Sequence, residues 1–187
     1  MKIVESKWYS QLIKISDYIL IGLLWSLVSL PLVTIFSSLN AVFRTFQIWK
    51  TETTGNIIYH FFRGFKKHFL KLTLLNILVL LYVMFIINRI EGVISENSFF
   101  LGVIVFSIIV ATSFLYQFIL LASVNDKISF NIFVKATNNC VLYFFSNVIF
   151  IILTIGLVIV GFKLPHLFLV LVPIYLYLVY LNSKLTI

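Results

Sequence analysis

The segment SLPLVTIFSSLNAVFRTF, Ser29–Phe46, interrupts the first apolar stretch of the chain with a proline and several hydroxyl-bearing side chains. Pro31 removes one hydrogen bond of a helix, and its ring clashes with the preceding turn. A hydroxyl such as that of Thr34 can bind the backbone groups that such a break sets free. The segment therefore predicts a structural break at Pro31 and Thr34, which sets the path of the chain into its first polar loop.

The composition identifies a lipid bilayer as the solvent of the chain. Of its 187 residues, 61% are hydrophobic and 11% are charged, and the mean hydropathy is +1.11. Ordinary soluble domains have about 45–50% apolar and about 25% charged residues, so the composition excludes a soluble fold. The 20 Phe, 9 Tyr and 3 Trp are typical of membrane interfaces and of packing between helices.

Five apolar segments approach the length of about 20 helical residues that crosses a bilayer core. They run over residues 18–39, 72–88, 99–124, 141–162 and 164–181. Their hydrophobicity is continuous rather than alternating, which favours helices over a β-barrel. We predict an all-α, polytopic transmembrane helical bundle that forms a single membrane domain over residues 1–187, with residues 1–17 as a juxtamembrane segment.

The placement of lysine and arginine predicts that loop 44–71 lies on the cytoplasmic side of a cell membrane, because basic loops are retained inside. This loop carries six basic residues, whereas the short turn after the second segment has only Arg89. Two alternatives remain for the N-terminus. If the first segment is one kinked span, nine basic residues lie inside and five outside; if it is a re-entrant helical hairpin, the counts are twelve and two.

Residues 57–71 have the periodicity of an amphipathic helix. An apolar stripe is formed by Ile58, Phe61, Phe62, Phe65 and Phe69, with basic residues on the other side. In the inner headgroup plane such a helix attracts anionic lipid by about 1 kcal/mol per basic residue. It is either a simple anchor or a contact for a transporter subunit or a second copy of the chain. The predicted contact residues are Phe61, Phe62, Arg63, Phe65, Lys66, Lys67, Phe69 and Lys71.

The sequence indicates no catalytic, cofactor or metal site. The apolar segments contain no ionisable side chain away from their ends, where a proton or ion pathway would need one. Cys140 is the single cysteine and has no clustered histidines for a metal, and neither an HExxH nor a GxSxG motif occurs. In the absence of these groups we expect no enzymatic activity. The positive charge lies outside the spans without a folded basic surface, so we also expect no nucleic-acid binding.

Neutral polar side chains inside the apolar segments are typical of hydrogen bonds between membrane helices. A second interpretation concerns Asn76, Gln117 and Asn147, which come from three different segments. If they converge, their amides suit a neutral polar solute such as a sugar. This interpretation predicts a small-solute transporter or channel component as the alternative function.

Two stretches, SLPLVTIFSSLNAVFRTF and IIYHFFRGFKKHFLKLTLLN, resemble the YesL family of bacterial membrane proteins. The matching residues are Trp25, Leu30, Pro31, Leu32, Val33, Thr34, Ala41, Phe61, Phe62, Arg63, Phe65, Lys66 and Phe69. The resemblance is detailed over residues 15–80, although Phe36 stands where the family has a small residue. It implies a family of unassigned biochemical function, often encoded beside carbohydrate-uptake and polysaccharide-degradation genes. Together with the lack of ion-coupling residues, it predicts a non-enzymatic membrane accessory or scaffold protein associated with carbohydrate uptake or utilisation.

Overall fold

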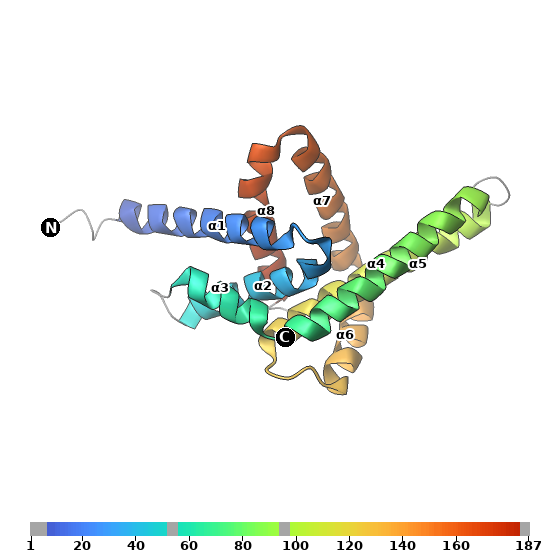
Figure 1. Cartoon of the computed structure of the whole chain (residues 1–187), viewed down its shortest axis with the longest axis horizontal. Coiled ribbons are helices and arrows are strands. Elements are labelled where there is room, and N and C mark those ends of the chain that lie inside the picture. The colour runs from blue at the N-terminus through green and yellow to red at the C-terminus, as the bar shows by residue number, and fades with distance from the viewer. Residues whose placement is uncertain (1–6, 52–55, 94–97, 184–187) are drawn as a thin grey trace.

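The computed structural model describes residues 7–51, 56–93 and 98–183, and the regular elements of these residues are all helical. The α-helices are α1 (Lys7–Ser29), α2 (Ile35–Thr51), α3 (Ile57–Lys66), α4 (Phe69–Val93), α5 (Ser98–Val124), α6 (Phe130–Leu142), α7 (Phe144–Lys163) and α8 (Pro165–Ser183), and a short 3-10 helix, η1 (Leu32–Thr34), precedes α2. In Figure 1, α1, α2 and α3 double back on one another, α4 and α5 extend as a long pair, and α7 and α8 stand as a second pair. The predicted all-α fold is confirmed.

Four of the described helices contain stretches long and apolar enough to cross a membrane. These stretches are Leu12–Ser29, Phe69–Asn88, Gly102–Val124 and Phe144–Gly161, and α8 adds a shorter apolar stretch, Leu171–Asn182. Only 11% of the α4 stretch and 6% of the α7 stretch is buried in protein, so most of their apolar side chains face outward. Outward-facing apolar helices require lipid around them, and the chain is therefore a helical membrane protein.

The break at the first apolar segment is a turn between two helices. Helix α1 ends at Ser29 and α2 begins at Ile35, so the apolar segment over residues 18–39 is divided between two helices at the predicted break. The Thr34 hydroxyl lies 2.5 Å from the Val28 carbonyl oxygen, which α1 leaves without an intrahelical donor. The hydroxyls of Ser29 and Ser38 bond across the turn at 2.7 Å. The first segment is thus the start of a helical hairpin rather than a kinked helix.

Helix α2 lies at the centre of the fold and contacts α1, α3, α4, α5 and α8. Phe46 is 1% exposed, and its ring centroid lies 5.3 Å from that of Tyr177 and 6.1 Å from that of Tyr18. The polar side chains of α2 are buried as well; these are Ser37, Ser38, Asn40 and Thr45. The larger hydrophobic core of the described residues therefore forms around a helix that is not itself a membrane span.

The polar segment after α5 contains a helix, α6, that was not predicted from the sequence. It buries Ile132, Ala136 and Cys140, which recur at every fourth residue, and Ile132 and Ala136 join a second core with residues of α4 and α5. The fourth apolar segment, predicted from Val141, is helix α7, which begins at Phe144. The apolar stripe of α6 is narrow and interspersed with polar residues, and its sequence is therefore similar to that of a solvated loop.

Candidate functional site

The predicted amphipathic helix over residues 57–71 is two helices joined by a tight bend. Helix α3 ends at Lys66, Lys67 is extended, and α4 begins at Phe69. His68 between them has φ +61°, a left-handed conformation that costs non-glycine residues roughly 1 kcal/mol or more. The prediction of one continuous helix is therefore wrong, because the chain turns sharply at His68 to enter the membrane span of α4.

Helix α3 packs directly on the backbone of α2. A Cβ atom at Gly64 would lie 3.1 Å from Ala41 Cα and 3.4 Å from Ala41 O, so close that the backbone of α2 would have to give way to a side chain. The Asn40 amide donates to Gly64 O at 3.1 Å and to Lys67 O at 3.4 Å, and so satisfies carbonyls that the end of α3 leaves open. Phe61 is fully buried in this interface, which corrects its predicted role as a surface contact.

The outer side of the bend forms a groove of about 690 Å³. Its lining residues are Phe62, Phe65, Lys66, His68, Phe69, Leu70 and Lys71. Five of them belong to the contact predicted from the sequence, and Phe62 is 41% exposed. Arg63, also in that prediction, is exposed on α3. The groove combines aromatic walls with lysine ammonium groups, so it suits an amphiphilic, anionic surface.

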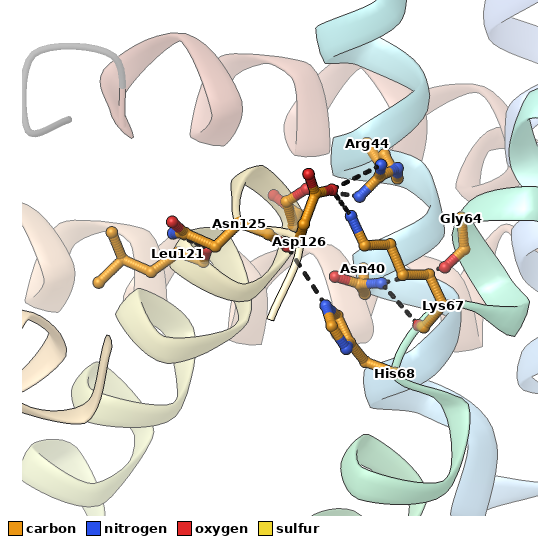
Figure 2. Close-up of polar contacts among 9 residues, drawn as sticks. Asn40, Arg44, Gly64, Lys67, His68, Leu121, Asn125 and Asp126 are labelled. Atoms are coloured by element: carbon orange, nitrogen blue, oxygen red, sulfur yellow. Dashed lines mark hydrogen bonds and ion pairs between the residues drawn. The ribbon is translucent and has the colours of Figure 1, made fainter. Parts of the chain in front are cut away.

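A cluster of polar contacts holds the bend against the C-terminal end of α5 (Figure 2). Asp126 forms ion pairs with Lys67 and, at 3.5 Å, with Arg44. Arg44 also donates to Ser123 O at 3.4 Å, and the Nε2 of His68 lies 3.2 Å from Asn125 O. Cations at the C-terminus of a helix are favourable because the last carbonyls carry partial negative charge. We call Arg44, Lys67, His68, Asn125 and Asp126 the basic latch.

The charges of the basic latch shift two pKa values. Hydrogen bonding and the positive charge of Lys67, followed by those of Arg44, lower the pKa of Asp126 below its ordinary 3.8. Burial lowers the pKa of His68 below its ordinary 6.5; the charges of Lys67, Lys71 and Arg44 act in the same direction, and the bond to Asn125 opposes them. At neutral pH the latch therefore holds a carboxylate with two cations beside a neutral imidazole.

The three amides predicted to meet a solute do not all come together. Gln117 Nε2 donates to Asn147 Oδ1 at 2.9 Å between α5 and α7, and both side chains are buried. Asn76 instead donates to Leu32 O at 2.5 Å, at the turn before α2. These bonds connect helices, and none of the three side chains lines the larger groove or the interior cavity described next.

A cavity of about 370 Å³, here called the interior cavity, lies between α1, α2, α4, α5, α7 and α8, and some of its lining residues are exposed on the surface. Its walls are predominantly apolar, and its few polar side chains include Thr112, Thr154 and Tyr175. Within the described parts of the chain, no three His, Cys, Asp or Glu side chains lie close enough to hold a metal ion. The buried Cys140 has a free thiol, with its sulfur 3.8 Å from Val110 O.

The basic latch was not predicted as a unit. Asp126 stood in the sequence as a lone carboxylate in a polar loop, with its partners 59 and 82 positions away. The only local signal was the change from apolar to polar residues at SVNDK, which marks the end of the α5 span. Such long-range ion pairs become visible only when the helices are placed beside one another.

The fold and this site define a polytopic helical membrane protein with a groove lined by aromatic and basic side chains. A family model described as "Protein of unknown function, DUF624" matches residues 18–90, which run from the second half of helix α1 through most of α4. The chain is similar to that family over the hairpin, the groove and the bend. No curated protein and no solved structure matches the chain.

Proposed function

We propose that the protein is a non-enzymatic accessory or scaffold protein of the cell membrane, and that the groove at the α3–α4 bend is its cytoplasmic contact. The observation that carries this proposal is the exposed aromatic and cationic lining of that groove. Buried Phe61 and Gly64 fix the inner face of α3 on α2, while Phe62 and Lys66 remain available outside. A surface whose backbone is already held in place loses little conformational entropy when a partner binds, which suits a docking role.

The basic latch supports this role because it fixes the bend from the other side. Within the protein, Asp126 forms ion pairs with Lys67 and Arg44. In contrast, the side chains of Lys66, Lys71 and Arg63 are exposed and can form ion pairs with a partner. Three cations near an anionic leaflet contribute about 1 kcal/mol each. Anionic lipid of the inner leaflet is therefore one ligand of the groove, and a membrane transport subunit with an acidic cytoplasmic surface is the proposed protein partner.

The packing of the hairpin supports a re-entrant arrangement with the N-terminus inside. Asn76, which binds Leu32 at the hairpin turn, comes seven residues after Phe69 at the start of the α4 span. Seven helical residues rise about 10 Å, so the turn lies well short of the far side of a core about 30 Å thick. Near the other end, the rings of Tyr18 and Trp49 lie 5.3 Å apart, next to the basic loop. This arrangement has twelve basic residues inside and two outside.

The link to carbohydrate uptake or utilisation rests on the resemblance to the YesL family alone. The match over residues 18–90 is to a family of unknown function and carries no substrate. On the basis of that resemblance, we propose that the transport subunit belongs to a carbohydrate uptake system.

In-cell photocrosslinking tests the proposal. A photoreactive residue at Phe62, which is exposed beside the groove, is compared with one at the adjacent Phe61, which is fully buried. We expect position 62 to capture a subunit of a membrane transporter and position 61 to capture no other protein. Capture of lipid alone at position 62, in cells that express the native neighbours, would reduce the groove to a membrane anchor and overturn the accessory role.

A small-solute carrier remains the second candidate, because the interior cavity has a volume typical of ligand pockets. The amides Asn76, Gln117 and Asn147 are bonded within the protein and lie outside that cavity's lining, which weakens the case for a sugar. Sugar flux in proteoliposomes that Gln117→Leu abolishes would favour the carrier over the scaffold.

A further inference from the structure

The interior cavity lies at the middle of three membrane-spanning stretches. Val79, Thr112 and Thr154 all line it, and each stands near the midpoint of its stretch in α4, α5 or α7. Stretches of this length extend across the hydrocarbon core, so their midpoints mark the middle of the bilayer. At that depth the surrounding solvent consists of the ends of lipid chains, whereas headgroups and water are about 15 Å away.

The cavity is closed by protein on one side and opens toward lipid on the other. Ile35, Phe36, Leu39 and Phe43 of α2 line it on the side of the helical hairpin. Among the residues on its α5 and α7 walls, Thr112, Thr154 and Val158 are exposed on the surface, and Val158 is 43% exposed. A chain of carbon atoms can therefore enter sideways from the bilayer without crossing a polar region.

The hydroxyl groups around the cavity are already satisfied by backbone carbonyls. Thr112 donates to Ile108 O and Thr154 to Phe150 O, each at 2.7 Å, in the manner of hydroxyls within one helix. The two tyrosines donate to carbonyls of neighbouring helices: Tyr175 donates to Phe150 O of α7 at 2.9 Å, and Tyr116 donates to Val179 O of α8 at 3.3 Å. The hydroxyl hydrogens are thus used within the protein, so a sugar placed here would exchange its hydration for few hydrogen bonds, whereas a hydrocarbon chain has none to lose.

We propose that this cavity binds the hydrocarbon tail of a membrane lipid, which enters laterally at the middle of the bilayer. A volume of about 370 Å³ lies within the range of about 300–1,000 Å³ of ligand pockets, and an apolar cavity of this kind binds apolar molecules rather than water. This inference is independent of the proposed scaffold role, because the cavity and the groove share no lining residue.

Quenching of tryptophan fluorescence by brominated lipid tests the proposal. Trp25 lines the cavity, so the other two tryptophans, Trp8 and Trp49, are replaced by phenylalanine. The protein is reconstituted into vesicles of phosphatidylcholine with bromine either near the ends of the acyl chains or near the carboxyl groups. We expect stronger quenching by the bromine near the chain ends.

Variants that narrow the cavity distinguish quenching by a bound lipid tail from quenching by the lipid that surrounds the protein. Val158→Phe and Val79→Phe, made singly and together, fill space from two of the lining helices, α7 and α4, whereas Ile152→Phe alters an exposed residue of α7 outside the lining. We expect the cavity variants to reduce the quenching by about half or more, since packed interiors have little spare room, and the control to leave it unchanged. Equal quenching by both bromine positions, or quenching that properly folded Val79→Phe and Val158→Phe proteins leave unchanged, would overturn the proposal.

Discussion

Helices α2 and α7 are opposites in composition and in environment. Helix α2 carries Ser37, Asn40 and Thr45, is not apolar enough to count as a membrane span, and is nearly enclosed by protein. Helix α7 is one of the most apolar stretches of the chain, yet only 6% of its span is buried. The order expected of a soluble protein, with apolar residues inside and polar residues outside, is thus reversed between these two helices.

The physical reason is that lipid removes the usual driving force for apolar burial. Lipid tails are as apolar as leucine, so α7 gains no hydrophobic stabilisation by leaving them, and polar groups in hydrocarbon must find partners within the protein. The polar side chains of α2 do so: Asn40 binds carbonyls at the end of α3, and Ser37 bonds with Thr73 of α4 at 3.1 Å. Stability should accordingly be concentrated around α2.

The largest expected effect comes from removing one buried ring of α2. Phe46→Ala should lower the free energy of unfolding by about 3–5 kcal/mol, because Phe46 is 1% exposed and a cavity remains in its place. Phe145→Ala is the matched control, since Phe145 of α7 is 83% exposed, and we expect a change within about 0.5 kcal/mol. Denaturant titration in mild detergent measures both values, and equal losses would contradict the comparison.

The close approach of α2 and α3 predicts the next effect. Gly64→Leu should destabilise the protein by about 3 kcal/mol, the upper part of the range for overpacking, because the new side chain would meet the Ala41 backbone. Gly156→Leu adds the same atoms on α7, where nothing lies within 4 Å of a new Cβ atom. The readout is the midpoint of thermal denaturation in detergent; a Gly156 variant as unstable as the Gly64 variant would count against the packing argument.

A smaller effect is expected from the amide that joins α2 to the bend. Asn40→Ala should cost about 1–2 kcal/mol, because the carbonyls of Gly64 and Lys67 lose a buried donor. The exposed Asn138 of α6 serves as the control, and its replacement by alanine should be nearly neutral. Indistinguishable unfolding free energies for the two variants would show that the amide bond does not hold the bend.

The smallest expected effect is a pH dependence of the basic latch. His68 has a lowered pKa in the folded protein, so below pH 6.5 the unfolded chain binds more protons and stability falls as the pH decreases. We expect thermal stability to drop between about pH 7.5 and about pH 5.5, and His68→Gln to reduce that drop while keeping a donor toward Asn125 O. An identical pH dependence in the variant would assign it to other groups.

The composition and the continuous hydropathy of the chain were sufficient to predict a helical membrane bundle, because a bilayer admits few backbone structures. Pro31 with Thr34 marked the break, and the phenylalanine and lysine pattern marked most of the groove residues. Local chemistry acts at these positions, so neighbouring residues alone indicate the outcome.

Only the tertiary structure decided that α2 forms the centre of the core, that Phe61 is buried, and that His68 splits the predicted amphipathic helix. The same holds for the ion pairs of Asp126 with Arg44 and Lys67, which are distant in the sequence.

In lipid, hydrophobicity does not distinguish a buried face of a helix from an exposed one. Burial is set instead by shape and by long-range hydrogen bonds, such as the Gly64–Ala41 approach and the Asn40 amide, and these depend on the placement of whole helices.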